Sequence, residues 1–320
     1  MFSGKRQIIG LDLGPARASA IVLSFGERDE MNSVHDFASV SIEPAEGPPA
    51  MDSVLAQLLG KLRTRCRECA ISVWPRGAKL RLFEAEATPL AAPRKNGKAA
   101  NLQTLFHEEL PDYIAAVGPV ASLHEAPGAA MRVATAIPRS GLEEIENALR
   151  KLRYKLQVLQ LAPVAILNAF TASHATVAAE QAFVLVDLGL SAATIIAGLR
   201  GMVCTIRVVE HGWVQGSVGT GGISGQQWLS EVTREIFSVC DYLETQEHRR
   251  SLEHIYVSGA LTKEAPAMKA LANALQLRCE EWNPLRHARA EKRVLRHEEL
   301  IPSLPFLPGA AGVAFQFAAA

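Results

Sequence analysis

Two aspartates in the sequence each precede a Leu-Gly pair, and this pattern can bind a phosphorylated ligand. Asp12 is followed by Gly14 and Asp187 by Gly189. A glycine at the tip of a hairpin exposes backbone amides that can donate to phosphate oxygens. The carboxylate before it can hold magnesium through water, because this ion prefers oxygen ligands and keeps much of its hydration. Two facing hairpins of this kind would clamp a triphosphate between them.

The elements expected around the two aspartates are also alike. Residues 8–25 and 183–199 both have the pattern of a buried strand, a turn and a return strand. Aligning Asp12 with Asp187 also aligns small or hydroxyl side chains in the return strand, with Thr194 in the second copy. This internal repeat predicts two lobes built on one plan.

Length and composition agree with two lobes. The chain has 320 residues, of which 48% are hydrophobic and 21% charged, enough to bury two cores. Its 33 basic residues balance 33 acidic ones, so no overall field favours nucleic acid or an anionic membrane. The apolar run after Lys5 and Arg6 is short and soon meets the charge of Asp12, which argues against a signal peptide. Five cysteines without export signals predict reduced thiols in the cytoplasm.

Hydrophobic periodicity predicts the remaining elements. Asp52 or Ser53 is expected to cap one helix, and a capping box at Ser140 and Glu143 predicts the start of another at about 141–153. Further helices are expected near 101–114, from 162, from 227, around 268–275 and at 307–320, and further strands near 34–42, 69–84, 118–124, 130–137, 155–161, 202–209 and 255–259.

Three other patterns have simpler interpretations than a functional site. The glycine-rich loop 216–225 lacks the Lys-Ser or Lys-Thr of a phosphate-binding P-loop. Cys66 and Cys69 have thioredoxin spacing, but they precede a strand instead of opening a helix. The basic segment 286–297 could face lipid headgroups or an acidic partner, but a solvated surface segment is the favoured interpretation.

The order of the motifs resembles that of the actin, sugar-kinase and heat-shock-protein ATPase superfamily. The segment at Asp12 resembles its first phosphate motif, the segment from Asp187 to Thr194 its second, and Tyr256-Val257-Ser258-Gly259-Ala260 its adenosine motif. Within the superfamily, the sequence resembles the PilM family of type IV pilus assembly proteins, which are relatives of FtsA. The more specific part of the match is the succession of residues 229–236, 241–246, 255–260 and 282–285.

The resemblance implies an α/β fold with two actin-like (ribonuclease H-like) lobes and an FtsA-type subdomain inserted in the first lobe. The implied divisions are 1–84 for the first lobe, 85–160 for the inserted subdomain, 161–182 for a return helix of the first lobe, 183–306 for the second lobe and 307–320 for a C-terminal helix packed back on the first lobe.

The resemblance also implies ATP and magnesium as cofactors, with magnesium held by Asp12 and Asp187 through water. Pro15 stands where the family has serine, so one amide donor is lost, and Ala260 replaces the second glycine of the adenosine turn. A degenerate nucleotide site is therefore expected. The residues expected at the nucleotide are Asp12, Gly14, Arg17, Asp187, Gly189, Ser191, Thr194, Gly259 and Ala260.

The implied function is that of a cytoplasmic adaptor or scaffold in a type IV pilus or related secretion platform. PilM-like proteins bind the N-terminal cytoplasmic segment of the inner-membrane protein PilN, in a groove where the inserted subdomain meets the first lobe. The chain is therefore expected at the inner face of the inner membrane, held there by a PilN-like partner and other pilus-platform proteins. Membrane contact would be indirect, and no nucleic acid is expected.

Two alternatives stay open at this stage. An active ATPase or small-molecule kinase of the superfamily would need a general base in the cleft, and Asn168, near the usual position, is too weak a base. An FtsA-like filament protein would be tethered to the membrane by a basic amphipathic helix, whereas residues 315–320 carry no charge.

Overall fold

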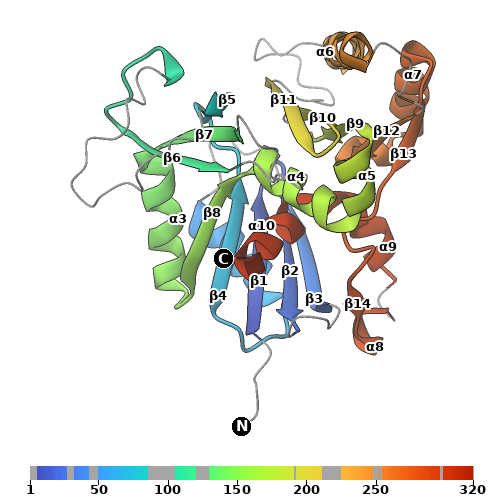
Figure 1. Cartoon of the computed structure of the whole chain (residues 1–320). Coiled ribbons are helices and arrows are strands. Elements are labelled where there is room, and N and C mark those ends of the chain that lie inside the picture. The colour runs from blue at the N-terminus through green and yellow to red at the C-terminus, as the bar shows by residue number, and fades with distance from the viewer. Residues whose placement is uncertain are drawn as a thin grey trace.

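The computed structural model has two lobes and a smaller subdomain beside the first lobe (Figure 1). It describes residues 6–26, 32–42, 50–85, 105–119, 130–190, 192–210, 225–247, 252, 254–295 and 298–319. Each lobe is built on one sheet, and the two sheets share the same strand plan. This agrees with the two lobes that the internal repeat predicts.

The sheet of the first lobe has six strands in the order β14-β3-β2-β1-β4-β8. The strands β1, β2 and β3 form an antiparallel meander, and β4 and β8 continue the sheet in parallel with β1. Their bounds are β1 Arg6–Leu13, β2 Arg17–Phe25, β3 Ser33–Ser41, β4 Glu68–Val73, β8 Lys155–Leu161 and β14 Arg289–Ala290.

The sheet of the second lobe repeats this plan in the order β11-β10-β9-β12-β13. Here β9 takes the place of β1, and β12 takes the place of β4 as its parallel neighbour. The bounds are β9 Ala182–Leu188, β10 Ala192–Leu199, β11 Met202–Glu210, β12 His254–Ser258 and β13 Arg278–Glu281.

A separate antiparallel sheet in the order β5-β7-β6 forms the inserted subdomain. Its strands are β5 Lys79–Ala85, β6 Tyr113–Pro119 and β7 Ala130–Pro138. The next strand, β8, returns to the first-lobe sheet, where it pairs with β4. We therefore propose 79–138 as the extent of the inserted subdomain in place of 85–160.

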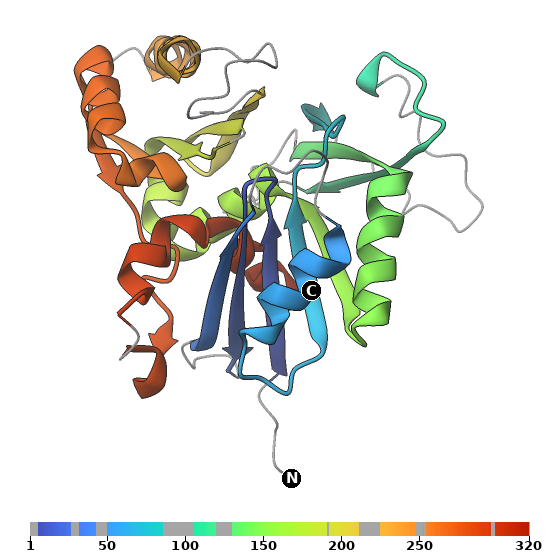
Figure 2. The ribbon, with the colours of Figure 1, turned by 180° about the vertical axis from the view of Figure 1, so that it is seen from behind.

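Helices cover both faces of the first-lobe sheet. On the face turned to the viewer in Figure 2, α1 (Met51–Gly60) and α3 (Arg139–Lys151) close a core with the strands. On the face seen in Figure 1, α10 (Pro308–Ala319) crosses α4 (Ala162–Ser173). The second lobe carries α6 (Gly225–Glu247) and α7 (Ala265–Leu275), and the short elements are α5 Ala175–Glu180, α8 Lys292–Leu295, α9 Leu300–Ser303, η1 Ala260–Lys263 and η2 Leu304–Phe306.

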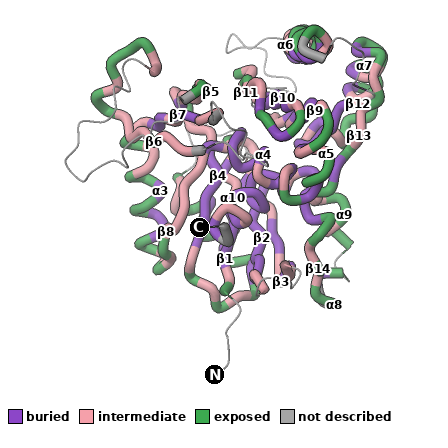
Figure 3. Tube along the Cα trace, in the orientation of Figure 1, coloured by how far each residue is buried: buried purple, intermediate pink, exposed green. Residues whose placement is uncertain are grey.

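The largest core lies between the lobes, along α4 and α10, and appears as the buried centre of Figure 3. Glycines allow these helices to approach one another and the sheet closely. A Cβ atom at Gly10 of β1 would lie 2.0 Å from the Ala310 carbonyl oxygen, and one at Gly312 would lie 1.7 Å from that of Ala165. Because real Cβ contacts are never this short, neither position accepts a larger residue without movement of α10.

Several local predictions are wrong. The helix α3 begins at Arg139 directly after Pro138, so Ser140 lies inside its first turn and makes no capping hydrogen bond. Pro138 ends β7 and fixes a backbone angle that leads into the helix, so the helix starts earlier than the capping box predicts. The helix α1 likewise begins at Met51 without a side-chain cap from Asp52.

The predicted helix at 101–114 is also wrong at its C-terminal end, because Tyr113 begins strand β6. This segment pairs with β7, and cross-strand pairing outweighs its local helical pattern. Residues 101–104 and 120–129 lie outside the described part, as does the loop at 211–224. The predicted C-terminal helix is confirmed as α10.

No single helix in the described ranges is both long enough and apolar enough to cross a membrane. One bent pair, Leu300–Phe306 with Pro308–Phe317, meets the criteria by length and composition only.

Candidate functional site

The two predicted carboxylates lie at equivalent positions where the lobes meet. Asp12 is the last residue but one of β1, and Asp187 is the last residue but one of β9. The negative charge of Asp187 contributes to raising the pKa of Asp12, so the two groups lie within electrostatic reach of each other. The structure therefore brings together the two aspartates that the sequence pairs as a cation site.

A serine from the neighbouring parallel strand holds each carboxylate. Ser72 Oγ donates to Asp12 Oδ1 at 2.6 Å, and Ser258 Oγ donates to Asp187 Oδ1 at 2.7 Å. The sheet registers explain these contacts, because each serine lies directly opposite its aspartate on the adjacent strand. The two lobes thus repeat the hydrogen bonding as well as the strand order.

Both carboxylates titrate well above the normal range. Burial raises the pKa of Asp12 to about 7, and the hydrogen bond from Ser72 only partly offsets this effect. Burial also raises the pKa of Asp187 to about 6, against the lowering effect of Ser258. A divalent cation between the two groups would relieve both the desolvation and the mutual repulsion. The carboxylates therefore fit a hydrated magnesium ion.

Two of the three glycine amides predicted at the nucleotide, those of Gly14 and Gly259, are hydrogen-bonded within the protein. The Gly14 amide donates to the Arg17 carbonyl at 3.0 Å, and the Gly259 amide donates to the Pro305 carbonyl at 2.8 Å. Pro15, at the tip of the first hairpin, has no amide hydrogen. In this conformation, therefore, neither glycine amide can donate to a triphosphate.

Arg17, expected to bring charge to a phosphate, is directed elsewhere. Its guanidinium carbon lies 4.1 Å from the centre of the Phe306 ring, and its Nη1 donates to Ser39 Oγ at 2.9 Å. Burial lowers the pKa of this guanidinium. Arg17 therefore joins the first hairpin to the segment that precedes α10.

The other predicted nucleotide residues lie around the second hairpin. Thr194 is buried and pairs with Asp187 in the register of β9 and β10. A Cβ atom at Gly189 would lie 2.7 Å from the Ala192 carbonyl oxygen, so this turn is tight. Ala260 begins the 3-10 helix η1, and Ser191 lies outside the described residues.

No catalytic base accompanies this arrangement in the described part of the chain. Asn168 on α4 donates to Gln160 Oε1 at 3.1 Å and to Gln316 Oε1 at 3.3 Å, so its amide is already engaged. The described residues also contain no cluster of three or more histidine, cysteine, aspartate or glutamate side chains suited to a metal ion. Asp12 and Asp187 are thus a pair of carboxylates with no third metal ligand of these types among the described residues.

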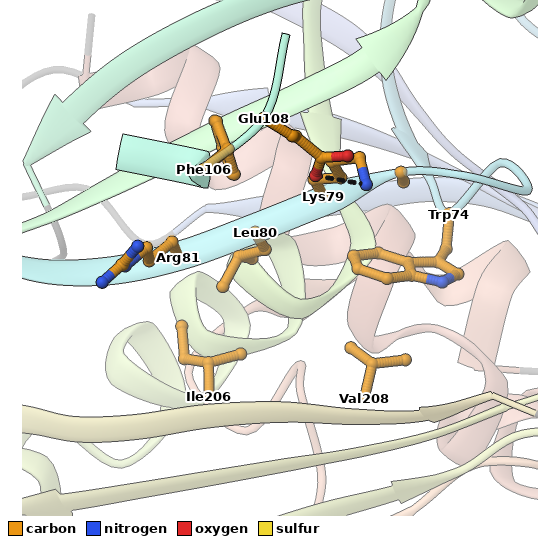
Figure 4. Close-up of a pocket in the computed structure, with 9 residues that line it drawn as sticks. Trp74, Lys79, Leu80, Arg81, Phe106, Glu108, Ile206 and Val208 are labelled. Atoms are coloured by element: carbon orange, nitrogen blue, oxygen red, sulfur yellow. Dashed lines mark ion pairs between the residues drawn. The ribbon is translucent and has the colours of Figure 1, made fainter. Parts of the chain in front are cut away.

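A second candidate site is a cavity of about 350 Å³ where the inserted subdomain meets both lobes (Figure 4). Trp74 and Leu80 lie on one side and Ile206 and Val208 of β11 on the other. The Trp74 indole N–H is buried and has no acceptor among the described residues. A cavity lined by these apolar side chains can accept an apolar side chain of a ligand.

Charged groups line one rim of this cavity. Lys79 and Glu108 form an ion pair at 2.6 Å, and this hydrogen bond raises the pKa of Lys79. Arg81 Nη1 donates to the Leu105 carbonyl. The rim therefore has an excess positive charge beside an apolar floor.

Sequence reasoning missed the residues that complete both sites. Ser72 and Gly309 were not identified, although a Cβ atom at Gly309 would lie 2.4 Å from Asp12 Oδ1. The cavity residues Trp74 and Val208 are far apart in sequence and carry no motif. Only Ser72 had a usable signal, since a polar residue near the end of an apolar parallel strand faces the same sheet edge as Asp12.

Comparison with known proteins confirms the predicted fold class. No protein-family model and no curated protein matches the sequence. Among solved structures, the PilM-PilN type IV pilus biogenesis complex contains a chain similar to this one at 18% identity and a TM-score of 0.76, over 98% of each chain. A protein of unknown function with an actin-like ATPase fold from Bacteroides thetaiotaomicron is similar at 8% identity and a TM-score of 0.50, over 88% of this chain and 93% of that one. The chain thus has the actin-like fold and is similar to PilM over nearly its whole length.

Proposed function

We propose that the protein is a PilM-like adaptor of a type IV pilus or related secretion platform. In this role it binds the N-terminal cytoplasmic segment of a PilN-like inner-membrane protein and is held at the inner face of that membrane by its partner. The full-length likeness to the PilM chain of the PilM-PilN complex supports this proposal. The site at Asp12 and Asp187 is the degenerate remnant of a nucleotide site and does not support efficient catalysis.

The observation that carries the proposal is the cavity beside the inserted subdomain. Its floor combines an indole, a leucine and two β-branched side chains, which favour an apolar anchor residue of an extended peptide. Lys79 and Arg81 at the rim could meet acidic groups of the peptide. Since Ile206 and Val208 belong to the second lobe, a peptide seated here would touch both lobes and the inserted subdomain.

The test is a binding measurement with the PilN-like protein from the same organism. Its N-terminal cytoplasmic segment, made as a labelled synthetic peptide, is titrated with the full-length chain and followed by fluorescence anisotropy. We expect saturable binding, weakened about tenfold or more by Trp74→Ala and by Val208→Ser, because each removes part of the apolar floor.

Met202→Ser is the matched control, because Met202 lies on the same strand as Val208, is 47% exposed and does not line the cavity. This variant is expected to bind like the original chain. The proposal fails if the peptide does not bind. Binding that withstands both cavity substitutions would move the peptide site elsewhere.

A further inference from the structure

The segment 304–309, which we call the clamp segment, contacts the Asp12 hairpin of the first lobe and the turn after β12 of the second lobe. On the second-lobe side, the Pro305 carbonyl accepts the hydrogen bond of the Gly259 amide at 2.8 Å. On the first-lobe side, the Phe306 ring lies 4.1 Å from the Arg17 guanidinium carbon. The same few residues therefore touch the two turns that would otherwise hold the ends of a nucleotide.

The C-terminal half of the clamp segment is held in place by tight packing. Leu307 is fully buried in the core between the lobes. Gly309, in the first turn of α10, packs so closely on Asp12 that a Cβ atom there would overlap the carboxylate. The segment therefore cannot move away from the first hairpin without displacing the start of α10.

The turn at Gly259, which the clamp segment contacts in the second lobe, is also tightly packed. Gly259 has φ of 93°, a conformation that favours glycine, and a Cβ atom there would lie 2.5 Å from the Leu188 carbonyl oxygen. The turn after β12 is thus pressed onto the Asp187 hairpin while its amide points to Pro305. Both lobe hairpins are in this way linked through one internal segment.

We propose that the clamp segment holds the two lobes together in place of a nucleotide, so that the lobe arrangement of this protein does not depend on ATP. Two groups that the fold would direct at a nucleotide are engaged elsewhere. The Gly259 amide donates to the Pro305 carbonyl of the clamp segment, and the Arg17 guanidinium lies over Phe306 of the clamp segment while its Nη1 donates to Ser39 Oγ of β3. The inference concerns only the clamp segment and the turns that it contacts, and it does not depend on the peptide cavity.

The first experiment titrates the full-length chain with magnesium ATP by isothermal calorimetry, up to millimolar nucleotide. We expect no saturable binding in the calorimeter. We also expect that magnesium ATP does not change the rate of hydrogen exchange in the backbone segment that contains Gly259. Micromolar affinity, or slower exchange at Gly259 with magnesium ATP, would overturn the proposal.

The second experiment removes the clamp. Phe306→Ala is expected to speed exchange of the Gly259 segment about tenfold, because loss of the ring releases Arg17 and the adjoining Pro305 carbonyl. Phe237→Ala is the matched control, since Phe237 is 47% exposed on α6 and should leave this exchange unchanged. If Phe306→Ala does not fold, Arg17→Gln tests the same contact from the other lobe. Unchanged exchange at Gly259 in the folded variants would contradict the clamp.

Discussion

The hairpins at Asp12 and Asp187 share their strand pairing and their serine partners, but they differ in what packs behind them. Two residues before the aspartate, the first lobe has Gly10, whereas the second lobe has Leu185. Helix α10 crosses β1 at Gly10, while Leu185 contributes its side chain to the core between the lobes. The repeated plan therefore breaks at the point where the C-terminal helix returns.

This difference assigns unequal roles to the two aspartates. Asp12 is covered by Gly309 of α10, and its pKa is raised to about 7, whereas that of Asp187 is raised to about 6. In the first lobe the hairpin is part of a helix-packing contact, and a polar group there is held at a cost to stability. Both hairpins have a buried serine partner, so the serine does not distinguish them.

The largest effect is expected at the glycine that distinguishes the lobes. Gly10→Ala would place Cβ 2.0 Å from the Ala310 carbonyl oxygen, so α10 must shift from β1. We expect a loss of about 3 kcal/mol or more in the free energy of unfolding, measured by urea denaturation. Gly60→Ala, at the end of α1 with nothing within 4 Å, is the control and should be close to neutral. A loss of less than about 1 kcal/mol for Gly10→Ala would mean that the helix contact is loose.

The next effect separates the two aspartates by pH. Because both folded-state pKa values are raised, the native state binds more protons than the unfolded state from about pH 4 up to about 7 for Asp12 and about 6 for Asp187. Stability from these groups therefore falls as the pH rises through that window. Asp12→Asn should remove this loss and stabilise the protein at pH 8 by on the order of 2 kcal/mol, and Asp187→Asn by less.

The measurement is the thermal midpoint of each variant between pH 5 and pH 8. The advantage of Asp12→Asn over the original chain should shrink as the pH is lowered. Asp241→Asn, an exposed carboxylate on α6, controls for the loss of one charge. If Asp12→Asn raised the thermal midpoint by the same amount at pH 5 and at pH 8, the pKa of Asp12 would not be raised in the folded protein.

Much of the fold could be predicted because strand periodicity survives in both lobes. The segment around Asp12 was expected as strand 8–13 and is β1, and the repeat at 183–199 is β9 and β10. These strands are almost wholly apolar, and such continuous apolar runs predict strands that are buried on both faces. The failures, at Ser140 and Tyr113, lie where a proline or a partner strand outweighs the local pattern.

The site was predictable only as far as its carboxylates. Asp12 and Asp187 follow from the repeat, but the engagement of Gly259 by Pro305 and of Arg17 by Phe306 depends on how a distant segment packs. A glycine in a motif predicts an available amide, whereas the fold decides whether a carbonyl already accepts its hydrogen bond. For this reason the sequence predicted a phosphate site where the structure has internal hydrogen bonds.

A smaller effect tests whether the serine contacts are equivalent. Ser72→Ala and Ser258→Ala each remove a hydrogen bond from a buried serine to a partly buried carboxylate, and each is expected to cost about 1–2 kcal/mol in the free energy of unfolding at pH 8. Each loss should also raise the pKa of its aspartate further, since the serine hydrogen bond lowers that pKa. Both consequences are read from urea denaturation at several pH values. A cost confined to one lobe would break the equivalence that the matching registers indicate.

The smallest effect is expected on the outer surface of the second lobe. Arg207 on β11 pairs with Glu235 on α6 at 2.6 Å, but the two side chains are 42% and 32% exposed. Arg207→Gln should lower the free energy of unfolding by less than about 1 kcal/mol, and added salt should reduce the difference. It should leave hydrogen exchange at Gly259 unchanged, because the pair lies outside the hairpin contacts. If Arg207→Gln lowered the free energy of unfolding as much as Ser258→Ala does, the stability of the second lobe would depend on its surface ion pairs. The comparison of the two hairpins would then no longer account for the difference between the lobes.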